Sequence, residues 1–212
     1  MTAPRDRETV VLVHGLWMKG WCMALLAWRL RRSGFETRCF SYRSMGSGLR
    51  ENAARLRDYL AALSPGMVHL VGHSLGCIVI RALFHYFPSQ QPGRIVMLTP
   101  PNQGSAVAEQ LARSGLGRTI LGKSVQELIA GVPKHWTVPV REIGIISGTV
   151  PLGLGRLFAK LSTPHDGVVT VEETALPGAC AQLMLPVAHT GALVTAQVAR
   201  TIAHFLRHGR FD

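Results

Sequence analysis

The sequence predicts an α/β fold in which a mostly parallel sheet is covered by helices on both faces. Apolar runs of strand length alternate along the chain with amphipathic segments of helical periodicity. The runs are almost wholly apolar, as TVVLV at 9–13 illustrates, and such strands are typical of sheets that helices bury on both sides. Strands and helices that alternate in this way form βαβ units, which make the sheet parallel.

Each expected element rests on one of these two patterns. Short apolar runs predict strands at residues 9–15, 35–42, 67–74, 94–100, 140–148 and 181–189. Apolar residues at helical spacing predict helices at residues 23–34, 49–63, 75–87, 105–115 and 190–209. The least regular stretches, 114–139 and 149–165, are interpreted as loop, short helix or a small lid. Ligands of such sheets bind beyond the carboxyl ends of the strands, so we expect the functional residues there.

Length and composition favour one globular domain over residues 1–212. A single core usually serves about 100 to 250 residues, and a chain with 47% hydrophobic and 17% charged residues is too apolar for disorder. No stretch reaches the roughly 18 unbroken apolar residues that suggest a membrane span. The charged N-terminus, MTAPRDRE, lacks the apolar region of a signal peptide. We therefore expect a soluble protein that is cytoplasmic or is the mature form after processing.

The charge balance is strongly basic, with 23 Lys and Arg against 12 Asp and Glu, a net charge of +11. Such an excess favours nucleic acid or anionic lipid as a partner. The arginines are scattered, however, and the sequence has no zinc-finger spacing, RNA-binding motif or basic block, so no nucleic-acid partner is expected. The four cysteines are far apart, which predicts free thiols and no metal site: Cys22, Cys39, Cys77 and Cys180.

The pentapeptide GHSLG at 72–76 places a serine between two glycines, directly after one apolar run and directly before a helical segment. A serine on a tight turn between strand and helix takes strained backbone angles, and glycine neighbours let the two elements approach while the hydroxyl stays exposed. A serine between glycines can also be an ordinary turn or helix cap. The strand before and the helix after Ser74 favour a nucleophile.

A nucleophilic serine needs a base and a carboxylate that orients the base. His189 follows the last apolar run and precedes the final helix, a position that suits the base. Asp166 is the sole aspartate between Ser74 and His189. Glu172 and Glu173 lie a few residues further on and remain competing candidates for the acid.

Two backbone amides are candidates for stabilising a developing oxyanion. Leu16 follows the first strand and Leu75 follows Ser74, so their N–H groups can face the same site from two loops. His14 is expected to hold the first of these loops by hydrogen bonds rather than to take part in chemistry.

With these residues identified, the chain resembles the α/β-hydrolase family, most closely its small bacterial lipases and esterases that have a minimal cap or none. The matching segments are HGLW at 14–17, GHSLG at 72–76, LTPPNQGS at 98–105, DGVV at 166–169 and His189. TPPNQGS is one residue longer than the Thr-Pro-x-x-Gly-Ser of many lipases, so the loop is expected to differ locally. The resemblance implies a triad of Ser74, Asp166 and His189, with the amides of Leu16 and Leu75 as the oxyanion hole.

This resemblance implies acyl transfer from a small-molecule or lipid ester, without a metal or organic cofactor. Trp17 and Met18 are candidates for lining an acyl pocket. Leu154, Leu157, Phe158 and Leu161 are spaced as on a short basic amphipathic helix, which either packs on the core or makes transient contact with an anionic membrane surface. A thioesterase or an acyltransferase with the same triad, a non-catalytic hydrolase-like binding protein and a nucleic-acid binder remain as alternatives.

Overall fold

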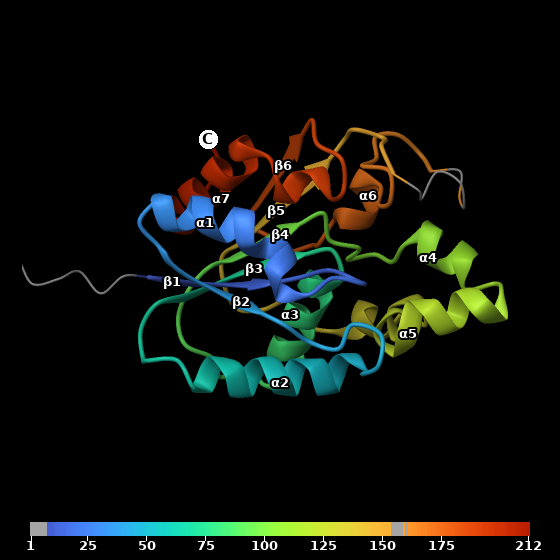
Figure 1. Ribbon diagram of the computed structural model, residues 1–212, viewed down its shortest axis with the longest axis horizontal. Coiled ribbons are helices and arrows are strands. Elements are labelled where there is room, and N and C mark those ends of the chain that lie inside the picture. Colours follow the sequence, from blue (N-terminus) through green and yellow to red (C-terminus); the bar gives the residue numbers. More distant parts are fainter. Residues whose placement is uncertain (1–7, 154–158, 160) are drawn as a thin grey trace, which may run out of the picture.

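Over the described residues, 8–153, 159 and 161–212, the computed structural model contains one sheet of six strands that all run parallel (Figure 1). The strands are β1 (Thr9–Val13), β2 (Glu36–Phe40), β3 (Val68–His73), β4 (Ile95–Leu98), β5 (Ile143–Gly148) and β6 (Ala181–Leu185). Their order across the sheet is β2-β1-β3-β4-β5-β6. The predicted α/β fold with a parallel sheet is confirmed.

Helices cover both faces of this sheet (Figure 1). The α-helices are α1 (Ala24–Arg32), α2 (Leu49–Ala61), α3 (Leu75–Tyr86), α4 (Ala106–Leu111), α5 (Gly115–Ile129), α6 (Val171–Thr174) and α7 (Ala196–His208). Three short 3-10 helices are described as well: η1 (Gly20–Met23), η2 (Val132–His135) and η4 (Gly191–Leu193). In residues 8–153 and 161–212, no helix combines the length and apolar character that a membrane crossing requires.

The alternation of side chains along β1 explains why its sequence is apolar throughout. Val11 and Val13 pack into one core with α2 and α3, whereas Val10 and Leu12 pack into a second core with α1 and α7. All four side chains are fully buried, and each contributes roughly 1.5–3 kcal/mol through removal of apolar area from water. A strand buried on both faces has no position at which a polar side chain would be solvated.

The strand order reverses beside β1, and this reversal brings two loops together. The chain runs from β1 to its neighbour β2, then crosses to β3 on the other side of β1. The ends of β1 and β3 are adjacent, with Val13 paired to Gly72. A crevice at the carboxyl end of such a reversal is the usual ligand site of an open α/β sheet.

The irregular stretch 114–139 is mostly helical, since α5 covers Gly115–Ile129. Ser114 accepts a hydrogen bond from the Gly117 amide and so caps the start of α5. Glycines weaken the helical pattern in this stretch, and Gly122 breaks the helix with a φ of 75°. Of the interpretations open from the sequence, helix is therefore the one that applies to most of the stretch.

Other boundaries differ from the prediction by a few residues. The predicted helix at 105–115 ends at Leu111, the predicted strand at 181–189 ends at Leu185, and the predicted helix at 190–209 divides into η4 and α7. The four-residue helix α6 was not predicted. Most of the amphipathic segment expected around Leu154, Leu157 and Phe158 lies outside the described residues.

The close approach of α3 to β1 can be tested at Gly76. An added Cβ at Gly76 would lie 2.2 Å from the Val13 carbonyl oxygen and 2.6 Å from that of His14. Because backbone atoms cannot yield as a flexible side chain does, we expect Gly76→Ala to lower the free energy of unfolding by about 1–3 kcal/mol or more. Urea unfolding measures this change. Gly66→Ala is the matched control, since no atom lies within 4 Å of its added Cβ, and an equal effect of both variants would contradict the prediction.

Candidate active site

Ser74 occupies the turn between β3 and α3 with backbone angles that non-glycine residues rarely adopt, φ 51° and ψ −123°. The turn is fixed by backbone hydrogen bonds from Ser74 N to Leu98 O (2.9 Å) and from Cys77 N to Ser74 O (3.0 Å). Gly72 gives the room that the turn needs, because a Cβ there would lie 2.8 Å from the Cys77 backbone. The residue is therefore held in a strained conformation, which typically costs about 1–3 kcal/mol and is frequent at functional sites.

His189 and Asp166 form a buried pair. The Nδ1 atom of His189 lies 2.7 Å from Oδ2 of Asp166, and the His189 amide donates to the Asp166 carbonyl at 3.0 Å. The other carboxylate oxygen, Oδ1, accepts from the amides of Val168 (2.9 Å) and Val169 (2.7 Å). The DGVV segment thus folds around its own aspartate and presents one oxygen to His189. This arrangement leaves Nε2 as the ring atom of His189 that is available for chemistry.

The two competing glutamates do not reach His189. Glu172 is exposed. Glu173 accepts from the Thr170 amide at 2.8 Å and from the Ala106 amide at 2.6 Å, so it caps α6 and ties it to the start of α4. Burial raises the pKa of the Glu173 carboxyl. Of the three candidate acids, Asp166 is the one that the structure brings to the histidine.

His73 contacts the backbone of His189, and the sequence did not predict this contact. Its ring is buried, and Nε2 donates to the carbonyl oxygen of His189 at 3.1 Å. Nδ1 has no hydrogen-bond partner among the described residues. Burial, followed by the nearby charge of His189, lowers the pKa of His73 to about 3, so the ring stays neutral near pH 7. A neutral ring with its proton on Nε2 braces the loop that carries His189.

His14 supports the loop after β1, as expected from the sequence. Its Nε2 accepts from the Tyr42 amide (3.2 Å), so Nδ1 carries the proton and donates to Gly15 O (2.8 Å). The Tyr42 hydroxyl in turn donates to the His14 carbonyl at 2.9 Å, and the two rings stack. Burial lowers the pKa of His14, which favours the neutral form that these hydrogen bonds require.

The amide of Leu16 lies in the loop after β1, and the amide of Leu75 lies at the start of α3. Leu75 is the first residue of α3, where an N–H group has no acceptor within the helix. Neither amide donates to any group in the described part of the chain. Gly15 lets the first loop approach, since a Cβ there would lie 3.2 Å from that of Ser74. Two unpaired donors are thus present beside the serine.

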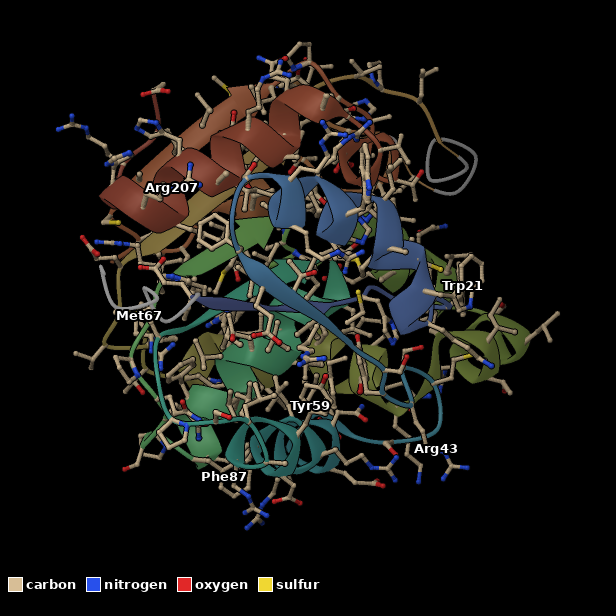
Figure 2. All side chains as sticks on the ribbon, turned by 60° about the vertical axis from the view of Figure 1, so that its left-hand side comes forward. Trp21, Arg43, Tyr59, Met67, Phe87 and Arg207 are labelled. Atoms are coloured by element: carbon tan, nitrogen blue, oxygen red, sulfur yellow. The ribbon has the colours of Figure 1, made fainter. Side chains whose placement is uncertain are left out.

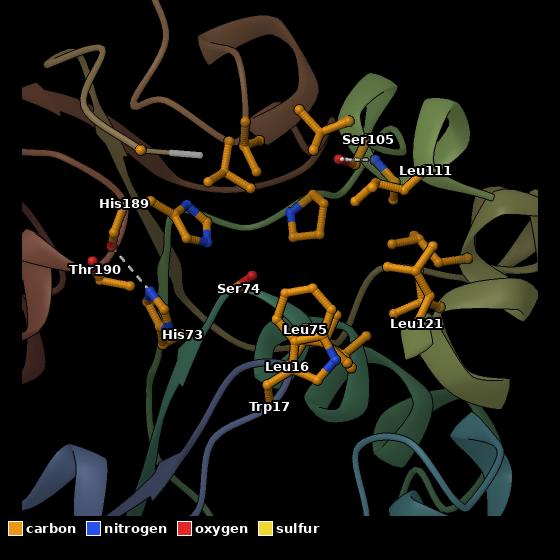
Figure 3. Close-up of a pocket in the computed structure, with 18 of the residues that line it drawn as sticks. Leu16, Trp17, His73, Ser74, Leu75, Ser105, Leu111, Leu121, His189 and Thr190 are labelled. Carbon is orange, nitrogen blue, oxygen red and sulfur yellow. Dashed lines mark hydrogen bonds between the residues drawn. The ribbon is translucent and has the colours of Figure 1, made fainter. Parts of the chain in front are cut away.

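Ser74, His189 and the two leucines, Leu16 and Leu75, line a cavity of about 620 Å³. In Figure 3 the Ser74 side chain points into this cavity near His189, with Leu16 and Trp17 below it. Residues of α4 and α5 form an apolar wall: Val107, Ala108, Leu111, Ile120, Leu121, Val125 and Leu128. Trp17 and Met18, the predicted pocket residues, also line the cavity. Its size is in the range of pockets for small organic ligands, and its wall suits an apolar group.

The α5 wall is connected to the loop after β1. At Gly122 the helix is interrupted, and the Ile120 carbonyl accepts a hydrogen bond from Trp17 Nε1 at 2.7 Å. On the other side of the break, the Lys123 amide donates to the Met45 carbonyl at 3.0 Å. Trp17 itself has a positive φ of 59°. Trp17 and Met45, which lie in two other loops, therefore form hydrogen bonds with the backbone groups on either side of the interruption.

Within the described ranges, no group of three or more His, Cys, Asp or Glu side chains is arranged to hold a metal ion. The four cysteines are all unpaired thiols.

The low pKa of His73 predicts a pH-dependent stability. In the unfolded chain a histidine has a pKa of about 6.5, whereas the folded value is about 3. Between these values the unfolded chain binds a proton that the folded chain does not, so the free energy of unfolding falls as the pH is lowered from 7 toward 4. We expect His73→Gln to reduce this slope without abolishing it, because burial also lowers the pKa of His14 and His69.

Urea unfolding across this pH range measures the slope. His208→Gln, which replaces an exposed histidine, is the control for the substitution itself. A His73→Gln protein with the slope of the unmodified chain would contradict the assignment of a neutral, buried ring.

Comparison with solved structures finds several proteins with a similar fold. A Bacillus licheniformis lipase, BlEst2 in its mature form, is 20% identical with a TM-score of 0.74, and the match covers 98% of this chain and 94% of that one. The metagenomic carboxyl esterase MGS0156 is 15% identical with a TM-score of 0.73, with coverage of 96% and 76%. A monoacylglycerol lipase of Paleococcus ferrophilus is 18% identical with a TM-score of 0.64, with coverage of 95% and 94%.

At these identities the likeness concerns the fold alone. The comparison with curated proteins found no significant match. The sequence model of the alpha/beta hydrolase family matches residues 10–206, nearly the whole chain, from β1 to the end of α7. With this match and the strand order described above, the chain belongs to the alpha/beta hydrolase family.

Proposed function

We propose that the protein is a serine hydrolase that cleaves carboxylic esters with medium or long apolar acyl chains. The observation that carries this proposal is the strained turn that exposes Ser74 to the same cavity as His189, whose Nδ1 is held by Asp166 at 2.7 Å. The similar solved structures, a lipase and a carboxyl esterase among them, support an ester as the substrate class.

In the first half of the reaction, Ser74 Oγ attacks the ester carbonyl carbon while His189 Nε2 takes the hydroxyl proton. Asp166 keeps the ring in the tautomer with the proton on Nδ1 and stabilises the imidazolium that forms. The carbonyl oxygen becomes an oxyanion, which the amides of Leu16 and Leu75 bind. His189 then gives its proton to the leaving alcohol as the acyl-enzyme forms.

In the second half, water replaces the alcohol. His189 removes a proton from the water as it attacks the acyl carbon, the same two amides bind the second oxyanion, and the proton returns to Ser74 Oγ as the acid leaves. All protons move between groups that this chain or the substrate supplies. The cycle therefore needs no group beyond the described residues and water.

Substrate preference follows from the cavity wall. Leu121, Val125 and Leu128 of α5 face the same space as Trp17 and Met18, and this surface offers an acyl chain apolar contact but few hydrogen-bond partners. Each methylene buried there contributes about 0.8 kcal/mol of transfer free energy. Binding should strengthen with chain length until the cavity is filled.

Replacement of the proposed nucleophile gives the primary test. We expect Ser74→Ala to lower kcat for nitrophenyl ester hydrolysis by about 10⁴ to 10⁶-fold, because no group remains to form the acyl-enzyme. Labelling with a fluorophosphonate, followed by peptide mapping, should modify Ser74 in the unmodified protein alone. Folded protein that is neither labelled nor active would refute the proposal, and turnover of thioesters in place of esters would redirect it to a thioesterase.

The role of the acid can be tested with a matched pair. Asp166→Asn keeps the shape of the side chain but disfavours the required histidine tautomer, so we expect kcat to fall by about 10⁴-fold. Glu173→Gln, a change at a rival carboxylate that contacts two amides rather than His189, should retain kcat within about tenfold. Equal losses in both variants would contradict the assignment of Asp166.

The position of the acyl chain in the cavity can be tested with a substitution that makes the cavity smaller. Leu121 is buried and lines the cavity, whereas Leu116 on the same helix is 76% exposed. We expect Leu121→Trp to move the optimum of kcat/KM for a nitrophenyl ester series to shorter chains, and Leu116→Trp to leave the optimum unchanged. A uniform loss at every chain length would show that this wall does not hold the acyl group.

A further inference from the structure

The outer face of η1 and α1 carries large apolar side chains that no other part of the described chain covers. Trp21 is 75% exposed, Leu25 40% and Trp28 46%. Their spacing places them on one side of the segment, while Met23, Leu26 and Leu30 on the other side are buried. Figure 2 shows Trp21 on the outside of this segment. The segment thus exposes three large apolar side chains on its outer side in addition to its buried apolar side, which an ordinary surface helix does not.

The charge of this face is entirely positive. The sequence has no acidic residue between Glu8 and Glu36, and α1 ends in Arg29, Arg31 and Arg32. The Arg32 guanidinium lies 5.2 Å from the centre of the Trp28 ring. None of the three arginines pairs with a carboxylate among the described residues. The positive charge beside the tryptophans is therefore not compensated locally.

The face also borders the candidate active site. Trp17 lines the cavity, is 57% exposed and precedes the start of η1 at Gly20 by three residues. On the other side, Arg29 donates to the carbonyl of Val194, a 56% exposed residue that lies five positions after His189. The exposed apolar residues and the arginines therefore extend from the cavity mouth along α1. We call Trp21, Leu25, Trp28, Arg29, Arg31, Arg32 and Val194 the α1 face.

We propose that the α1 face docks the protein on an anionic phospholipid surface. Tryptophan and leucine insert at the boundary between head groups and acyl chains, and arginines bind lipid phosphates at the same depth. The charge is complementary to an anionic leaflet, to which each nearby Lys or Arg adds attraction. Docking in this position brings Trp17, which lines the cavity, close to the lipid. This proposal concerns binding and stands apart from the reaction at Ser74.

Three double variants test this proposal. Trp21→Ser/Trp28→Ser removes the apolar contact, and Arg31→Gln/Arg32→Gln removes charge. Met67→Ser/Val140→Ser is the control, because both residues are exposed but precede β3 and β5 and belong to neither η1 nor α1. None of the six residues belongs to the proposed catalytic machinery. Hydrolysis of a soluble acetyl ester by each variant reports whether the fold and the active site are intact.

Vesicle sedimentation provides the measurement, with phosphatidylcholine alone and with phosphatidylcholine mixed with phosphatidylglycerol. We expect the unmodified protein and the control variant to bind the anionic vesicles, more weakly as salt is raised. The Trp variant and the Arg variant should each bind the anionic vesicles at least roughly tenfold more weakly than the unmodified protein. A blue shift of tryptophan fluorescence on anionic vesicles should accompany binding and be smaller in the Trp variant.

Three outcomes would overturn the proposal. One is the absence of binding by folded, unmodified protein, and another is binding by the Trp variant that equals that of the unmodified protein. The third is a dimer that the Trp variant abolishes, with no vesicle binding, which would assign the α1 face to a second copy of the chain. Binding is measured without turnover, so each of these outcomes leaves the proposal of ester hydrolysis unaffected.

Discussion

The packing of the first turn of α3 against the end of β1 is the constraint on which the site depends. Gly76 lies so close to the Val13 and His14 carbonyls that no side chain fits between them. In this arrangement the chain turns from β3 into α3 through the unusual backbone angles of Ser74. The same approach sets the amide of Leu75 beside the loop that carries Leu16. One steric contact thus fixes the serine and both candidate oxyanion donors together.

The groups around His189 are fixed in a different way, by hydrogen bonds from three directions. Asp166 holds the ring through Nδ1 and the backbone through its own carbonyl, and His73 holds the His189 carbonyl. Such preorganisation reduces the rearrangement needed when charge develops during a reaction. A neutral His73 suits this position, because a second cation 5.0 Å from the His189 ring would oppose protonation of His189.

The residues differ in how far the sequence alone could identify them. Ser74 was predictable because the requirements of its turn are local, and the parallel sheet was predictable because buried strands are apolar at every position. Asp166 was one of three candidate acids in the sequence and was favoured by the family resemblance, and its contact with His189 needed the structure. The bond between His73 and His189 joins residues 116 positions apart, so no local pattern encodes it. Helix α5 was obscured by its glycines, of which Gly122 interrupts the helix.

The interruption at Gly122 has a mechanical consequence. It frees a carbonyl of the apolar wall, Ile120, which Trp17 then holds across 103 positions of sequence. Trp17 is the neighbour of Leu16, the first of the two candidate oxyanion donors. A displacement of the wall at Ile120 would therefore pull on the loop that carries Leu16. A ligand that widens the cavity at Ile120 would therefore also affect the loop beside Ser74.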